Sequence, residues 1–218
     1  MTPAEIETAS RRKYNSASSS FFSSAEIYDL IYQAELEIAQ KTRMLEGLST
    51  ALTTTSGTRN YSMTSVMSEL KRVEYNGSKL KKIDMREDDS LTLSNSDSTA
   101  TGTPQYYSEW NRTIYLRPTP DTSSVVLRVY YYALPAPITS ASQVLEVPAL
   151  FHMCIVDYVA AEMASKDENH KTASVYFDKW YNKHLPEMEA WVAKKKRGDS
   201  FKVVKDELDT IGTYLGGV

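Results

Sequence analysis

Residues 114–138, "IYLRPTPDTSSVVLRVYYYALPAPI", combine alternating apolar positions with four prolines and four tyrosines. Successive side chains of a strand point to opposite faces, so a period of two predicts β-strands. We expect a hairpin around the loop "PTPDTSS". Its predicted core face carries Ile114, Leu116, Val125, Leu127, Val129 and Tyr131, and its other face carries Arg128, Tyr130 and Tyr132.

The β pattern extends towards the N-terminus, where Thr, Ser, Asn and Gly are common from about residue 49. Asn76-Gly77 predicts a second hairpin, because this pair favours a type I′ turn. Residues 86–103 are polar and poor in helix formers, so we expect a long surface loop there.

Helices are predicted before this region. Thr2, Pro3 and Glu5 form a helix start signal, and Ser23 with Glu26 repeats the capping box. We place these helices at about 2–16 and 24–46; the first has a thin apolar face, and the second has apolar residues at helical spacing.

Helices are predicted after the strands as well. Pro135 and Pro137 require an extended path, and Pro148 begins a segment that is apolar nearly all round, as is typical of a buried helix. A last helix from about Lys171 has one apolar and aromatic stripe, with a kink at Pro186.

The order of elements predicts an α+β fold. We expect an antiparallel bundle of about four helices from residues 1–47 and 139–197, with a β-rich domain inserted at 48–138. Residues 198–218 are predicted to be an extended tail without a packed core.

Composition excludes several classes of protein. A net charge of -3 among 218 residues gives no general attraction to phosphates, which argues against a dedicated nucleic-acid reader. Cys154 is the only cysteine, so no disulfide within one chain is possible. We find no signal peptide and no membrane span, and we expect synthesis in a reducing cytoplasm.

Catalytic motifs are not found. His152 on a buried helix is interpreted as a core group, and Asp157 on the same helix as a carboxylate that pairs with a neighbouring Arg or Tyr. Asp84, Glu87, Asp88 and Asp89 lack the calcium-loop spacing and are interpreted as a solvated acidic loop. We therefore expect no enzymatic activity, no cofactor and no metal.

The segments "PQYY" (104–107), "IYLRPTPD" (114–121), "LRVYYYALPAPI" (127–138) and "LEVPALFHMCIVDYVAAEMA" (145–164) together resemble the head-to-tail adaptor, or connector, proteins of tailed bacteriophages. The resemblance is strongest over about 104–165 and agrees in element order over the rest.

This resemblance implies a non-enzymatic virion protein that forms a ring, usually dodecameric, between the portal and the tail, with genomic DNA crossing the lumen. The implied partners are further copies of the chain, the portal protein and a downstream tail or nozzle protein, with no membrane. Tyr and Arg are common interface anchors. The candidate subunit or tail interface is Tyr106, Tyr107, Trp110, Arg128, Tyr130 and Tyr132; the candidate portal-binding tail is Lys195, Arg197, Phe201, Val203, Val204 and Tyr214.

Two other readings remain open at this point. One is a β-rich module for carbohydrate or protein on a helical stem, with Trp110 and the Tyr106-Tyr107 pair as a stacking platform. The other is a metal-dependent hydrolase that uses the acidic residues between Asp84 and Asp89.

Overall fold

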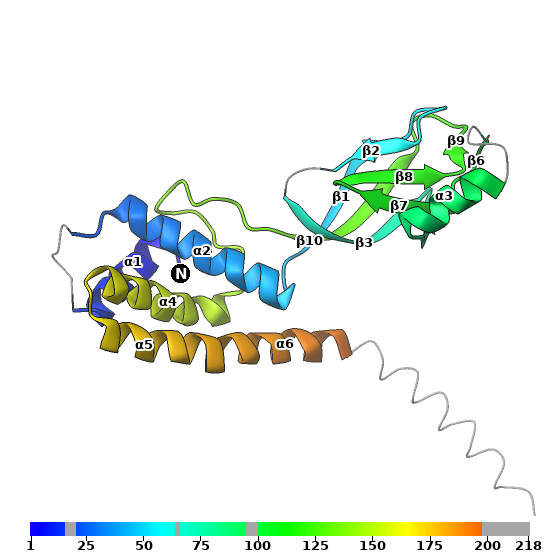
Figure 1. Ribbon diagram of the computed structural model, residues 1–218. Coiled ribbons are helices and arrows are strands. Elements are labelled where there is room, and N and C mark those ends of the chain that lie inside the picture. The colour runs from blue at the N-terminus through cyan, green and yellow to red at the C-terminus, as the bar shows by residue number, and fades with distance from the viewer. Residues whose placement is uncertain (16–20, 64–65, 95–99, 198–218) are drawn as a thin grey trace, which may run out of the picture. The chain divides into compact units, whose positions relative to one another are not determined.

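The computed structural model describes residues 1–15, 21–63, 66–94 and 100–197 (Figure 1). It contains two compact units, which are treated in turn. The helical unit combines Met1–Met44 with the described residues from Pro137 onward, and the β unit is Leu45–Ala136.

The first two helices begin at the predicted capping residues. In α1 (Pro3–Lys13), the Thr2 hydroxyl accepts a hydrogen bond from the Glu5 amide, and the Glu5 carboxylate accepts one from the Thr2 amide. At the start of α2 (Ser24–Thr42), the Ser23 hydroxyl accepts a hydrogen bond from the Glu26 amide, which is one of the two bonds of the predicted capping box. This second helix ends four residues before the predicted boundary, because Arg43 adopts a left-handed conformation with φ 52°.

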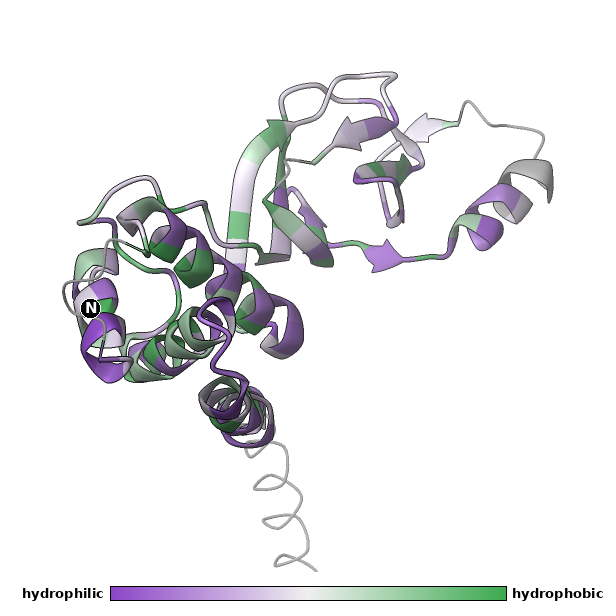
Figure 2. Cartoon of the chain, turned by 60° about the vertical axis from the view of Figure 1, so that its left-hand side comes forward, coloured by the Kyte–Doolittle hydropathy of each residue, from purple (hydrophilic) through white to green (hydrophobic). Residues whose placement is uncertain are grey.

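Helix α4 (His152–Lys166) is the buried helix of this unit, as predicted from its apolar composition. It follows a short 3₁₀ turn, Ala149–Phe151, and contacts α1, α2 and α5 (His170–Lys179). Figure 2 shows green apolar and purple polar bands along the helices. Ten of the fifteen residues of α4 are buried, so this helix forms the centre of the helical core.

The predicted last helix is interrupted. Between α5 and α6 (Leu185–Arg197) lies a π-helical turn, Trp180–His184, in which the Leu185 amide donates to the Trp180 carbonyl. The next residue, Pro186, has no amide hydrogen and therefore cannot donate a helical backbone hydrogen bond. This missing bond explains why the helix is irregular at this place. The apolar stripe is retained, with Trp180 and Met188 fully buried.

The β unit consists of two facing sheets and a short parallel pair. The strands are β1 (Glu46–Thr53), β2 (Asn60–Ser62), β3 (Met67–Tyr75), β4 (Ser78–Lys79), β5 (Lys81–Lys82), β6 (Thr101–Gly102), β7 (Tyr106–Trp110), β8 (Thr113–Arg117), β9 (Thr119–Pro120) and β10 (Val126–Ala133). The first sheet has the order β1-β10-β3-β4 and the second β2-β8-β7-β5, while β6 pairs with β9.

One apolar cluster joins the two sheets. It consists of Tyr61, Met67, Leu70, Val73, Tyr75, Leu80, Tyr107, Ile114, Leu116, Leu127 and Val129. The alternation in residues 114–131 therefore identifies the buried faces of β8 and β10 correctly, because these positions lie in the core.

The predicted hairpin between residues 114 and 132 is nevertheless wrong. Strand β8 pairs with β7 and β2, whereas β10 pairs with β1 and β3 in the other sheet. The linking segment "PTPDTSS" carries the chain from one sheet to the other. A period of two shows which face of a strand is apolar, but it does not show which strands are its neighbours. Here the apolar faces of β8 and β10 are buried because two sheets face each other, and the two strands do not pair.

The hairpins that do form turn at residues with positive φ. Asn76 and Gly77 have φ of 48° and 77° between β3 and β4, which confirms the predicted turn. Asn111 and Arg112, with φ of 46° and 57°, join β7 to β8. The second turn lacks glycine, and sequence reasoning did not identify it.

The predicted surface loop at 86–103 is also wrong in its first half, where α3 (Met85–Ser94) forms instead. The Asp84 carboxylate accepts a hydrogen bond from the Arg86 amide, and Glu87 and Asp88 place negative charge in the first turn. Residues 95–99 of the predicted loop lie outside the described residues.

The α+β class is confirmed. Five α-helices, α1, α2, α4, α5 and α6, are described in the helical unit, and the antiparallel four-helix arrangement stays a prediction.

Candidate interaction surface

The outer face of the first sheet carries the residues that we call the tyrosine–arginine face: Lys71, Arg72, Glu74, Lys79, Arg128, Tyr130 and Tyr132. Strand register places Tyr130 between Leu48 of β1 and Arg72 of β3. In the next row, Glu74 lies between Arg128 and Lys79. The face therefore follows from three adjacent strands and from the side of β10 that is turned away from the core.

Tyr130 is held in place by its neighbours. The guanidinium carbon of Arg72 lies 4.1 Å from the centroid of the Tyr130 ring, a cation–π contact. Arg72 also lies 2.7 Å from a carboxylate oxygen of Glu74, and the Tyr130 hydroxyl donates to the other oxygen at 3.3 Å. These three side chains form one contact network on the sheet surface, which limits their rotamer freedom before any partner binds.

A second aromatic contact lies beside the first. The Nζ of Lys71 is 5.6 Å from the Tyr132 ring centroid and donates to a Glu46 carboxylate oxygen at 2.7 Å. This hydrogen bond raises the pKa of Lys71. A hollow on the face is lined by Lys71, Arg72, Lys79 and Tyr130, so positive charge surrounds a half-buried aromatic ring.

The other predicted interface residues lie in the second sheet, on β7. Trp110 is 64% exposed at the end of the strand, and Tyr106 is half-buried with the Nζ of Lys81 5.9 Å from its ring centroid. Tyr107 is 2% exposed, and burial raises its pKa to about 12. Because Tyr107 belongs to the core, it does not form a surface platform with Tyr106 and Trp110.

The acidic stretch contains a buried ion cluster instead of a solvated loop. Asp88 is 1% exposed and forms ion pairs with Arg59 and Arg117, and the Ser108 hydroxyl donates to it at 2.9 Å. Its oxygens are thus occupied by protein donors, and α3 is fastened to the outer side of β7 and β8. Among the described residues, no group of three or more His, Cys, Asp or Glu side chains has a metal-binding arrangement.

The helical unit has its own buried carboxylate. Asp157 on α4 pairs with Lys13 of α1, Lys179 of α5 and His184, whose Nε2 lies 2.9 Å away. Burial lowers the pKa of Lys13 and of His184, with the charge of Lys179 adding to both effects. Asp157 is compensated by partners, as expected, but they are two lysines and a histidine where Arg or Tyr was predicted, and the cluster joins three helices.

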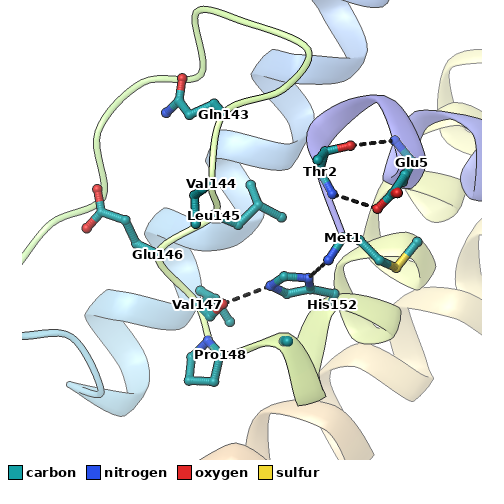
Figure 3. A pocket seen from close by; sticks show the side chains of 11 residues that line it. Met1, Thr2, Glu5, Gln143, Val144, Leu145, Glu146, Val147, Pro148 and His152 are labelled. Carbon is teal, nitrogen blue, oxygen red and sulfur yellow. Dashed lines mark hydrogen bonds between the residues drawn. The ribbon is translucent and has the colours of Figure 1, made fainter.

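His152 is a core group, as expected. Its Nε2 lies 2.9 Å from the Val147 carbonyl, and its Nδ1 lies 2.7 Å from the Met1 amine (Figure 3). Burial lowers the pKa of His152. The neighbouring segment is fixed by Glu35, which accepts hydrogen bonds from the amides of Glu146 and Val147. Both contacts stabilise the path that leads into α4.

The candidate portal-binding residues are only partly described. Lys195 is exposed on α6, with its Nζ 5.8 Å from the Trp191 ring centroid, and Arg197 is the last residue of this helix. Phe201, Val203, Val204 and Tyr214 lie outside the described residues. In the described part of the chain, no helix is both long and apolar enough to cross a membrane.

Taken together, an α+β framework with an exposed face of tyrosines and cations has the residue types of a protein-docking component. The family model "SU10 adaptor protein" matches residues 1–200, which includes both units. The chain belongs to this family of phage adaptor proteins. A comparison with curated proteins finds no match. Family membership supports a structural component of the bacteriophage virion that interacts with other head or tail components.

Proposed function

We propose that this protein is a non-enzymatic head-to-tail adaptor, whose copies form a ring between the portal and the tail. The observation that carries the proposal is the adaptor-family match over residues 1–200, because it spans the helical unit and the β unit together. In this role the portal protein, a downstream tail or nozzle protein and neighbouring copies are the partners, and genomic DNA passes through the lumen.

The contacts of the β unit agree with a docking role. Tyr130 and Arg72 are pre-ordered by their contact and by Glu74, so binding at this face loses less side-chain entropy than a set of free side chains would. Tyr and Arg are also the residue types most often found as interface anchors. A chain with net charge -3 does not retain DNA phosphates through its overall charge, as a conduit requires.

The experiment is an affinity pull-down of the tagged chain from cells that assemble the parent virus, with mass spectrometry and negative-stain imaging of the eluate. We expect a portal ring with this chain stacked on it. Recovery of the chain alone, or with a glycan, would contradict the adaptor role and favour a binding module.

We further propose that the residues after α6 contact the portal or an adjacent copy. A chain truncated after Arg197 tests this, because it keeps every helix and strand that the structure describes. We expect truncation to reduce portal recovery in the same pull-down. Unchanged recovery would show that the portal contact lies elsewhere.

A further inference from the structure

We propose that the tyrosine–arginine face of one copy binds helix α3 of the next copy, so that the β units contact each other head to tail. This proposal rests on the ring proposed above and names the two surfaces that build it.

The two surfaces lie on opposite sides of the β unit. The apolar cluster fills the space between the sheets, and Tyr107 of β7 points into it. Its neighbour Ser108 points to the other side, where it donates to Asp88 of α3. Helix α3 therefore lies on the outer side of the second sheet, beside β7 (Figure 1), whereas the tyrosine–arginine face is the outer side of the first.

Helix α3 presents negative charge at a fixed position. Asp84, Glu87 and Asp89 are exposed, and none of them has an ion pair within the part of the chain that the structure describes. Arg86 is the exposed cation among them. Figure 2 shows the hydrophilic character of this helix in purple. The buried ion pairs of Asp88 hold the helix against the sheet, so Glu87 and Asp89 are held on its two flanks.

The tyrosine–arginine face presents the complementary charge. The carboxylates of this face already have partners: Glu46 pairs with Lys71, Glu74 pairs with Arg72, and Glu69, opposite Tyr132, also has an interaction. Lys79 and Arg128 are exposed, and neither has an ion pair among the described residues. Two cations beside the Tyr130 hollow are thus available for carboxylates of a partner.

A second copy is the occupant that this arrangement favours. Complementary faces on opposite sides of one unit allow each copy to bind the next in the same way, and such heterologous contacts form a ring when the rotation closes. A two-fold contact between identical faces would instead bring Lys79 and Arg128 to carboxylates that already have partners.

The first test is carbodiimide cross-linking of purified virus particles assembled with equal amounts of ¹⁵N-labelled and unlabelled chain. We expect mixed-isotope cross-links that join Lys71 or Lys79 to Asp84, Glu87 or Asp89. Cross-links from Lys79 to a portal or tail protein, or no mixed-isotope links at these sites, would overturn the head-to-tail contact.

The second test reverses charge in the full chain. Lys79→Glu and Glu87→Lys are each expected to lower incorporation into particles by about threefold or more, and the double variant is expected to recover it, because exposed ion pairs are individually weak but repeat around a ring. Lys171→Glu, on an exposed site of the helical unit, is the matched control. Normal incorporation of both single variants would contradict the proposal.

The two proposals fail in different ways. If the wild-type chain is absent from particles, the adaptor function and this inference are both overturned. If the wild-type chain is present but the cross-links and charge reversals give the contrary results, only the head-to-tail contact of the β units is overturned.

Discussion

Each of the two units contains a buried aspartate surrounded by cations, but the cations differ. In the helical unit Asp157 pairs with two lysines and a histidine, whereas in the β unit Asp88 pairs with two arginines and a serine. The side chains of Lys13 and Lys179 are 28% and 40% exposed, and those of Arg59 and Arg117 are 30% and 17% exposed.

This difference relates to the elements that each aspartate joins: Asp157 joins three helices, and Asp88 attaches α3 to a sheet. Lysines can keep their ammonium groups near water while their stems pack, so Asp157 links α1 and α5 to α4 without burying every charge. Arginine offers a planar fork of donors that suits a carboxylate. Asp88 holds α3 against the sheet through two arginines, as the proposed docking of α3 requires.

The largest expected difference in stability between the two units concerns a buried tryptophan of the helical unit and an exposed tryptophan of the β unit. Trp180 is fully buried beside Tyr158, and its indole nitrogen donates to Glu37 at 3.0 Å. We expect Trp180→Ala to lower the free energy of unfolding by about 3–5 kcal/mol, measured by urea denaturation followed by circular dichroism. Trp110→Ala, at a 64% exposed site, is the control, with an expected change within about 0.5 kcal/mol. Similar losses in both variants would contradict this contrast.

The aspartates test the comparison directly. Removal of one partner from a buried ion pair costs about 3–5 kcal/mol, because the remaining charges stay buried. We expect the loss of stability in Asp88→Asn to approach the upper end of this range. The loss in Asp157→Asn should be smaller, since the lysines can turn towards water. The measurement is hydrogen exchange of the α3 and α4 amides in the wild-type chain and in each of the two variants. Asp89→Asn, an exposed neighbour, should leave α3 protection unchanged; equal effects of the two buried changes would remove the distinction.

The sequence predicted the helical unit better than the β unit. Caps and apolar stripes are local signals, so Thr2, Ser23 and the stripe of the last helix located the helices correctly. Strand pairing is not local. The alternation around Leu127 identified the core face of β10, but nothing in it showed that β1 and β3 are its neighbours.

The candidate interface shows the same limit. Arg128 and Tyr130 follow from alternation within one strand, while Arg72 and Lys79 come from strands whose register the sequence does not reveal. Tyr106 and Tyr107 were both placed in the candidate interface, although adjacent strand residues face opposite sides. Helix α3 was missed because its polar residues give no apolar stripe, and its anchor Asp88 pairs with distant arginines.

Gly47 tests the packing of the β unit on a smaller scale. A Cβ atom at this position would overlap the end of the Tyr131 ring, so the ring must move away from its place on β10. We expect Gly47→Ala to cost about 1–3 kcal/mol in thermal unfolding, the usual range for overpacking. Gly102→Ala, whose nearest contact would be 3.4 Å, should cost less. Adding Tyr131→Leu to Gly47→Ala should recover part of the loss, and failure to do so would show that the clash is not with this ring.

The smallest expected effect concerns pH and the helical unit. Burial lowers the pKa of His152 below its usual 6.5, so the unfolded chain takes up a proton at a higher pH than the folded chain does. The contribution of His152 is therefore fully present above pH 6.5 and is lost as the pH falls through the folded-state pKa. His184 acts in the same direction, whereas burial raises the pKa of Glu35 and Glu162 and these groups oppose it.

The contribution of His152 is isolated by comparing how the melting temperatures of the wild-type chain and of a His152 variant change with pH. We expect the melting temperature of the wild-type chain to fall by about 2–4 °C more than that of His152→Gln between pH 7.5 and pH 5.5, which corresponds to about 1 kcal/mol in a chain of this size. His170→Gln, at an exposed site, should retain the wild-type pH dependence. If His152→Gln retains it too, then the buried histidine does not couple protonation to unfolding, and the pH response of the helical unit belongs to His184 beside Asp157.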